Sequence, residues 1–233
     1  MRDEVLNDVA GTQLVGGSTA AAIDFSDIMI EKAPLFLLFV VGLSLLLLMI
    51  VFRSILIPIK AAILNLMTIG ASLGVVAWIF QEGMFGIPAG PVEAFVPVMS
   101  FAIIFGLSMD YEVFLMSRMR EEWQRTGDAT EAVRRGLAST GGVVTAAAAI
   151  MMAVFGSFVL DDARLLQQFG ISMAVAIFID AFVIRCLLVP AIMKVMGRGA
   201  WWMPTWLDKA LPHVTVEPES EPRPVEREPV LTR

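Results

Sequence analysis

The stretch "PVMSFAIIFGLSMDYEVFLMS", residues 97–117, is apolar along most of its length but carries Asp110, Tyr111 and Glu112 near its end. An α-helix rises about 1.5 Å per residue, so about 20 residues cross the roughly 30 Å hydrocarbon core of a bilayer. The stretch therefore predicts a transmembrane helix. It also raises the question of why a membrane span would contain acidic side chains.

Four other stretches have a similar length and apolar character. They are residues 35–52, 57–80, 137–160 and 169–193. In the whole chain 57% of the residues are hydrophobic, whereas soluble domains have about 45–50%. The sequence therefore predicts an all-α integral membrane protein in which residues 34–199 form a bundle of five transmembrane helices.

The basic residues predict how these helices are oriented. Arginine and lysine gather in the 53–60 turn, in the 118–135 loop and after the last span, whereas residues 81–96 have none and residues 161–168 have only Arg164. Cytoplasmic loops carry the excess of basic residues in membrane proteins. We therefore expect a multi-pass protein with an extracytoplasmic N-terminus and a cytoplasmic C-terminus.

The segment before the first span, residues 1–33, has no hydrophobic signal core. "TQLVGGST" predicts a short strand, and "DFSDIMIEKA" predicts a helix capped by Asp24 or Ser26. We expect residues 1–33 to be the trailing edge of a larger extracytoplasmic domain, in the C-terminal part of a longer transporter or in one subunit of a split one. The alternative is a five-span protein that inserts N-terminus first.

The segment after the last span, residues 200–233, has two parts. "WWMPTW", residues 201–206, predicts an aromatic anchor at the cytoplasmic interface. The following residues are rich in glutamate and proline, as in "VEPESEPRPVEREPV" (216–230). Such a composition cannot form a packed core, so we expect a disordered acidic tail.

Asp110 is the strongest candidate for a functional residue. A central aspartate raises the free energy of membrane insertion by roughly 2.5–3.5 kcal/mol, so it is expected to face the bundle interior. It lies about 13 residues into its span, roughly 20 Å from the outer surface. Burial disfavours the ionised carboxylate, which can then exchange protons near neutral pH, and the Tyr111 phenol can donate to it. The alternative is a hydrogen bond that only holds helices together.

Four other residues are candidates for a supporting polar network: Glu112, Thr145, Asp180 and Arg185. Glu112 is about 200° from Asp110 around an α-helix, so we expect it to pair with Arg118 or another basic residue near the inner boundary. Thr145 could approach Asp110 from a facing helix, or belong to a small-residue packing face.

Asp180 and Arg185 are five residues apart, which places them about 140° apart on an α-helix and predicts poor mutual pairing. Each is expected to bond to a neighbouring helix. Arg185 could be a counter-charge for Asp110 or another carboxylate, or extend to the inner interface.

Metal and cofactor sites have little support in the sequence. The single histidine, His213, lies in the tail region, and the single cysteine, Cys186, lies in a membrane run. This composition argues against a histidine-based metal centre or catalytic triad. We expect no metal, no cofactor, no catalytic residues and no nucleic-acid partner.

Four segments resemble the MMPL family of the resistance-nodulation-division superfamily. They are "VGGSTAAAIDFSD", "FRSILIPIKAAILN", "FGLSMDYEVFLMSRMREEW" and "IDAFVIRCLLVPAIM", within residues 12–200. The resemblance implies spans 8–12 of a twelve-helix transporter in the bacterial plasma (inner) membrane. It also implies that Asp110 and Tyr111 are one of two proton-relay pairs that drive export of lipids or other hydrophobic compounds. The first half of such a protein, with its own pair, is absent from this sequence.

Two other function classes remain possible from the sequence. An intramembrane aspartyl protease would use Asp110 and Asp180, although the glycine-flanked motif of such enzymes is missing from "GLSMD". The third possibility is an assembly subunit that transports nothing itself. The expected partners of the leading hypothesis are membrane lipids, a hydrophobic or lipid substrate, and the missing N-terminal half or a partner subunit.

Overall fold

The computed structural model describes residues 17–204 and contains five helices long and apolar enough to cross a membrane. Four are α2 (Ser18–Phe52), α3 (Leu56–Glu82), α4 (Phe95–Thr126) and α5 (Ala129–Ser157), the last followed by the 3₁₀ turn η1 (Phe158–Leu160). The fifth span is built from four consecutive elements: α6 (Arg164–Phe178), η2 (Ile179–Leu188), α7 (Val189–Met196) and η3 (Gly197–Trp201). The predicted all-α fold with five spans is confirmed.

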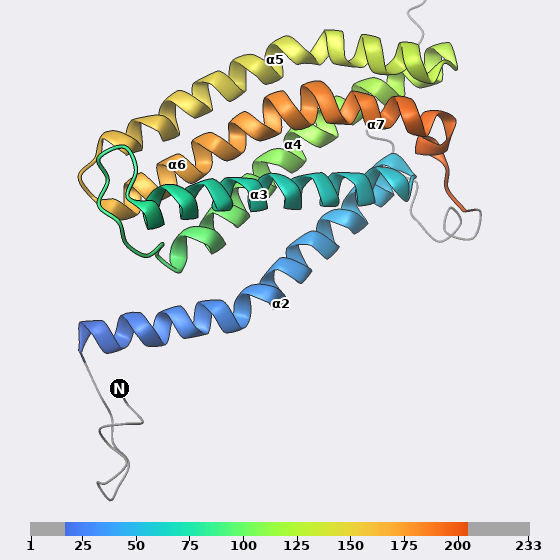
Figure 1. The fold of residues 1–233 in the computed structure, drawn as a ribbon. Helices are drawn as coiled ribbons and strands as arrows, with labels where there is room; N and C mark the ends of the chain where they lie inside the picture. The colour runs from blue at the N-terminus through green and yellow to red at the C-terminus, as the bar shows by residue number, and fades with distance from the viewer. Residues whose placement is uncertain (1–16, 205–233) are drawn as a thin grey trace, which may run out of the picture.

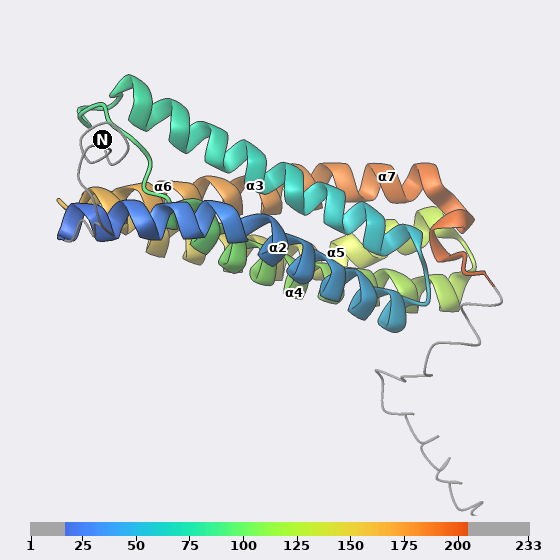
Figure 2. The same cartoon turned by 90° about the horizontal axis from the view of Figure 1, so that it is seen from below.

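Helices α3 to α7 form the bundle, and α2 joins it only along its last part (Figure 1). The ribbon of α2 bends part-way along its length, and the helix contains Pro34. A proline inside a helix removes a backbone hydrogen bond and clashes with the preceding turn, which accounts for the bend. Seen from below, the second half of α2 runs beside α4 (Figure 2).

Two glycines allow close helix packing around α5. A Cβ atom added at Gly136 of α5 would lie 2.6 Å from Cγ of Met119 on α4. A Cβ atom added at Gly170 of α6 would lie 2.6 Å from the carbonyl oxygen of Phe155 on α5. Both helices therefore approach α5 more closely than any larger residue would permit.

The core has apolar clusters at different depths. One cluster includes Ile57, Met116 and Met193, towards the end of the bundle where η3 lies. Another includes Phe105 and Met173, further along the same helices. Three of these helices also bring polar and charged side chains into the interior, and on α4 Ser108 and Glu112 lie in the sequence between the residues of the two clusters. The interior therefore contains buried polar groups beside its apolar clusters.

Several predicted boundaries differ from the structure. Asp24 and Ser26 lie inside α2 rather than at its cap, because the helix already begins at Ser18. The predicted 118–135 loop is also wrong, since α4 ends at Thr126 and α5 starts at Ala129. Asp128 caps α5 by accepting hydrogen bonds from the backbone N–H groups of Thr130 and Glu131. These helices are longer than the membrane requires, and hydropathy indicates only their membrane portion.

The end segments are only partly covered by the described residues. The predicted strand over 12–19 lies mostly outside them, and the part inside, from Ser18, is helical. Trp201, from the predicted aromatic anchor, stacks on Trp123 of α4 with ring centroids 6.5 Å apart. The predicted acidic tail lies outside the described residues.

Candidate functional site

Four charged side chains meet inside the bundle, and we call them the buried quartet: Lys60, Glu112, Asp180 and Arg185. They come from α3, α4 and η2, and each is at most 6% exposed. Lys60 Nζ is 2.7 Å from Glu112 Oε1, and Arg185 Nη1 is 3.5 Å from Glu112 Oε2. Arg185 Nε is 2.9 Å from Asp180 Oδ2. Two positive and two negative charges therefore balance in a region from which water is excluded.

Ser108 and Asn65 extend the quartet towards the middle of the bundle. The Ser108 hydroxyl lies 2.6 Å from Asn65 Oδ1 and 2.9 Å from Asp180 Oδ1, and it has one proton to donate. Arg185 donates to both the carbonyl oxygen and the hydroxyl of Ser108. These contacts link α3, α4 and η2. Within residues 17–204, the Asn65 amide nitrogen is buried without a hydrogen-bond partner.

Asp110 was expected to face the bundle interior, but in the described part of the chain it lies outside the quartet, on an exposed part of α4. It lines an open hollow of about 330 Å³ together with Val113, Phe114, Ser117, Arg118 and Glu121. Its side chain makes no hydrogen bond or ion pair with any other residue that the structure describes. The neighbouring Tyr111 is half-buried, and its ring centroid lies 5.3 Å from Arg185 Cζ. Tyr111 therefore contacts the quartet while Asp110 next to it has a free carboxylate.

The predicted poor pairing of Asp180 and Arg185 is wrong, because the helix between them is not an α-helix. Residues Ile179–Leu188 form a π-helix, η2. A π-helix makes i→i+5 hydrogen bonds, so residues five apart lie one turn above each other on the same face. Pro190 lies in the first turn of α7, directly after this segment. The span continues past it to Trp201.

The other predicted partners are found in part. Glu112 pairs with Lys60 and Arg185, whereas Arg118 Nη1 lies 2.8 Å from Glu121 Oε2 instead. Arg185 is 1% exposed, so it does not extend to the interface. The Thr145 hydroxyl donates to the carbonyl oxygen of Gly141 at 2.7 Å. No hydrogen bond joins Thr145 to Asp110, and both are among the described residues.

Lys60 was missed as a site residue because sequence reasoning assigned it to a cytoplasmic turn. It lies in the first turns of α3 and is buried. A sequence signal for its position did exist. Lys60, Thr68 and Ser72 recur at multiples of four residues, close to one face of a helix. The charge at the start of this polar series could have been placed inside the bundle.

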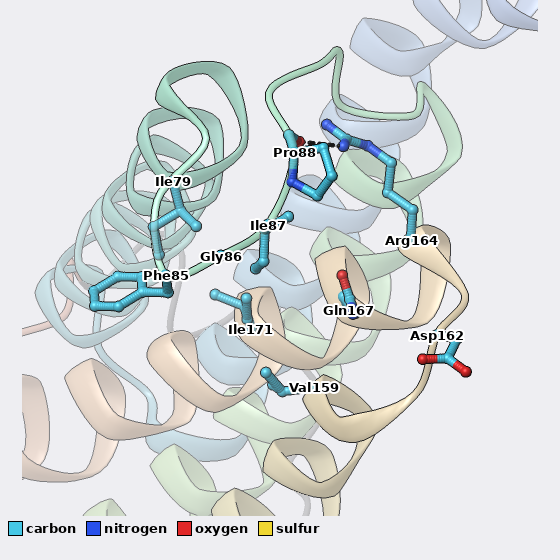
Figure 3. A pocket seen from close by; sticks show the side chains of 10 residues that line it. All are labelled: Ile79, Phe85, Gly86, Ile87, Pro88, Val159, Asp162, Arg164, Gln167 and Ile171. Carbon is cyan, nitrogen blue, oxygen red and sulfur yellow. Dashed lines mark hydrogen bonds between the residues drawn. The ribbon is translucent and has the colours of Figure 1, made fainter.

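A different pocket, of about 610 Å³, is lined by the connection that follows α3 and by the start of the fifth span (Figure 3). Arg164, at the start of α6, donates from Nη1 to the carbonyl oxygen of Pro88 at 2.6 Å, and its Cζ lies 5.1 Å from the Phe80 ring centroid. The arginine therefore ties the connection between α3 and α4 to the fifth span. Across residues 17–204, no three histidine, cysteine, aspartate or glutamate side chains gather in a way that could hold a metal ion.

The sequence also matches known proteins over most of its length. The model of the MMPL family matches residues 7–220. Membrane protein YdfJ of Bacillus subtilis is 43% identical over 218 residues, which are 91% of this chain and 30% of that protein. The trehalose monomycolate exporter MmpL3 of Mycobacterium tuberculosis is 38% identical over 199 residues, covering 84% of this chain and 21% of the exporter.

A further relative is the mycolic acid-containing lipids exporter MmpL11 of Mycolicibacterium smegmatis. It is 38% identical over 207 residues, which are 87% of this chain and 22% of that protein. The chain therefore spans less than a third of the length of each of these three relatives.

Proposed function

The chain belongs to the MMPL family, and on this premise we propose that it is the C-terminal membrane portion of a proton-motive-force-driven exporter of lipids or other hydrophobic compounds. Two of its relatives are named as exporters of trehalose monomycolate and of mycolic acid-containing lipids. Because those proteins are several times longer, the proposed partner is an N-terminal half, either on the same polypeptide or in a separate subunit.

The free carboxylate of Asp110 is the observation that carries this proposal. Adding a proton to Glu112 or Asp180 would leave the buried quartet with an excess positive charge, which is unfavourable in a low-dielectric interior. Asp110 has no such cationic partner among the described residues, so it can gain and lose a proton without breaking an ion pair. Asp110 is thus the proton carrier, and Tyr111 beside it is the second member of the proposed relay pair.

The proposed location is the bacterial plasma membrane, with the N-terminus outside and the C-terminus in the cytoplasm. The arginine- and lysine-rich segments 53–60 and 118–135, and the segment after the last span, then face the cytoplasm. Asp110 lies in the inner half of the membrane, within reach of protons arriving from outside. Proton entry supplies about 2.3 kcal/mol per 100 mV and about 1.4 kcal/mol per pH unit. This free energy can shift the bundle between two arrangements.

The protease hypothesis receives no support from the arrangement of the two aspartates. Aspartic proteases use two carboxylates close enough to share one proton. Asp180 is instead paired with Arg185, and no hydrogen bond joins it to Asp110 within the described part of the chain. We therefore propose a transporter rather than an enzyme, and a non-transporting assembly role becomes an outcome of the test below.

The test is Asp110→Asn in the complete protein, reconstituted into liposomes with an imposed pH gradient. Export of a fluorescent lipid is expected to fall at least tenfold, because an amide cannot carry a proton under these conditions. The helical circular dichroism and the size-exclusion profile should be unchanged. The matched control is Asp128→Asn. Asp128 does not belong to the quartet, and asparagine can still cap α5, so this variant should export at the parent rate.

Export at the parent rate in Asp110→Asn would contradict the proposal. If that variant also co-purified with another membrane protein that transports, the result would favour the assembly role. Peptide-bond cleavage that is lost in Asp180→Asn would instead favour a protease.

A further inference from the structure

The Ser108 hydroxyl faces more acceptors than it can serve. The residue is 1% exposed, and its Oγ lies 2.6 Å from Asn65 Oδ1, 2.9 Å from Asp180 Oδ1 and 3.0 Å from Arg185 Nη2. A hydroxyl donates one proton and accepts on two lone pairs, whereas an arginine only donates. The oxygens of Asn65 and Asp180 therefore compete for the single proton of Ser108.

The Asn65 amide shows the complementary mismatch. Its nitrogen carries two N–H groups, yet it is buried without a hydrogen-bond partner among residues 17–204. Buried N–H groups without a partner are rare in folded proteins, because they have lost the hydrogen bonds that water gave them. The side chain is 3% exposed, so the partner it needs has to come from the interior of this bundle.

A half-turn of the Asn65 amide removes both mismatches. The nitrogen and the oxygen of an amide have nearly the same size, so their exchange leaves the packing intact. Nδ2 then donates to Ser108 Oγ, which accepts from Asn65 and Arg185 and gives its one proton to Asp180. The amide oxygen takes the place without a partner, and an under-satisfied carbonyl oxygen is less unusual than an unpaired N–H group. Because 2.6 Å is slightly short for an N–H···O contact, the turned amide lies slightly further from Ser108.

We propose that Asn65 is the first donor of a directed hydrogen-bond chain that runs through the Ser108 hydroxyl to Asp180. Oδ1 of Asp180 then accepts from Ser108, and its Oδ2 accepts from Arg185 Nε at 2.9 Å. Both oxygens of this carboxylate are thus held by donors, unlike those of Asp110. Asn65 and Ser108 are positioning residues for the buried aspartate–arginine pair. This inference does not require any role of Asp110 in transport.

Two other arrangements each resolve only part of the mismatch. An internal water could accept from the Asn65 amide nitrogen, but Ser108 would still face two acceptors with one proton. A proton on Asp180 would let Ser108 donate to Asn65, but the amide nitrogen would remain without a partner. It would also leave Arg185 beside a neutral group in a low-dielectric interior. The turned amide satisfies Ser108, Asp180 and the amide nitrogen together.

The experiment observes the amide protons of Asn65 directly. The 233-residue chain has two asparagines, Asn7 and Asn65, so labelling with ¹⁵N-asparagine gives few side-chain signals. The full chain is studied in lipid bilayers by solid-state NMR, and Asn65→Leu identifies the signals of this residue. We expect one of its two amide protons to be shifted downfield by a hydrogen bond.

Three serine variants test the partner of that hydrogen bond. Ser108→Ala removes the acceptor, so the downfield shift should be lost, whereas Ser108→Thr keeps a hydroxyl and should retain it. The matched control is Ser72→Ala on the same helix as Asn65. The Ser72 hydroxyl donates to the carbonyl oxygen of Ser172 at 2.6 Å, and its removal should leave the Asn65 signals in place. Equal responses to Ser108→Ala and Ser72→Ala would overturn the proposal.

The parent chain alone carries the test if the variants do not fold. With ¹³C-serine added, dipolar recoupling should detect a close contact between the Asn65 amide nitrogen and a serine β-carbon, because the nitrogen points towards Ser108. Lack of this contact would overturn the proposal. Transfer of magnetisation from water to the two amide protons would also overturn it, since it would show that an internal water and not Ser108 is the acceptor.

Discussion

The two sides of α4 carry carboxylates with opposite surroundings. Glu112 is 4% exposed and contacts two cations, whereas Asp110, two residues earlier, is exposed and has no ionic partner among the described residues. Two steps along an α-helix rotate a side chain by about 200°, so one carboxylate reaches the interior and the other the outward hollow. The comparison teaches that the inward acid is held by two cations of the bundle, whereas the outward acid has no cation among the described residues. The proposed proton-carrying role of Asp110 depends on this difference.

The largest effect on stability is expected for a substitution on the side of α4 that faces the bundle interior. Arg185→Met would leave Glu112 with Lys60 alone and Asp180 without a cation. Breaking a buried ion pair by removing one partner typically lowers the free energy of unfolding by about 3–5 kcal/mol. Thermal unfolding in nanodiscs, followed by circular dichroism, measures this loss. Asp110→Asn, on the outward side, should unfold at the parent temperature, and equal losses in both variants would remove the distinction between the two sides.

A smaller effect on the free energy of unfolding is expected where α5 packs against α4. In Gly136→Ala the new methyl group would meet Met119 at 2.6 Å, and overpacking of this kind typically costs about 1–3 kcal/mol. Gly142 of the same helix has no atom within 4 Å of its virtual Cβ. Gly142→Ala should therefore stabilise the helix by about 0.5–1 kcal/mol. The unfolding temperatures of the two variants measure both changes, and a destabilised Gly142→Ala variant would show that this face is also packed.

The smallest effect on the free energy of unfolding is expected for the ion pair that lines the open hollow beside Asp110. Arg118 and Glu121 are about half exposed, and their ion pair is three residues apart on α4. Exposed pairs of this kind contribute about 0.2–1 kcal/mol and less in high salt. Arg118→Gln should therefore lower the unfolding temperature only slightly. A loss as large as that in Arg185→Met would mean that this hollow is closed to water, contrary to the comparison.

The membrane spans could be predicted from the sequence because their signal is local. The run at 35–52 and the run at 97–117 each fall within the range of about 17–25 residues that a bilayer-spanning helix has, whatever they pack against. The ends of the helices could not be predicted in the same way. α4 continues to Thr126 and α5 starts at Ala129, although the residues there are charged, since local ion pairs and the Asp128 cap support helix outside the apolar region.

The candidate site was predictable only in its residue types. The sequence singled out Asp110, Glu112, Asp180 and Arg185 because charges are rare in membrane spans. Their pairing depended on helix geometry, and the assumption of an α-helix separated Asp180 from Arg185. Lys60 was misplaced for a different reason, because a basic residue near the end of a span looks the same whether it faces the cytoplasm or a buried glutamate.

The π-helix η2 also has a consequence for comparing sequences. A π turn accommodates more residues than an α turn over the same face, so this segment can absorb a single insertion without rotating the elements on either side. In a relative whose corresponding segment is purely α-helical, the same aspartate–arginine contact would require a spacing of four residues instead of five. A one-residue gap in an alignment at this point would then mark a change of helix type and not a lost ion pair.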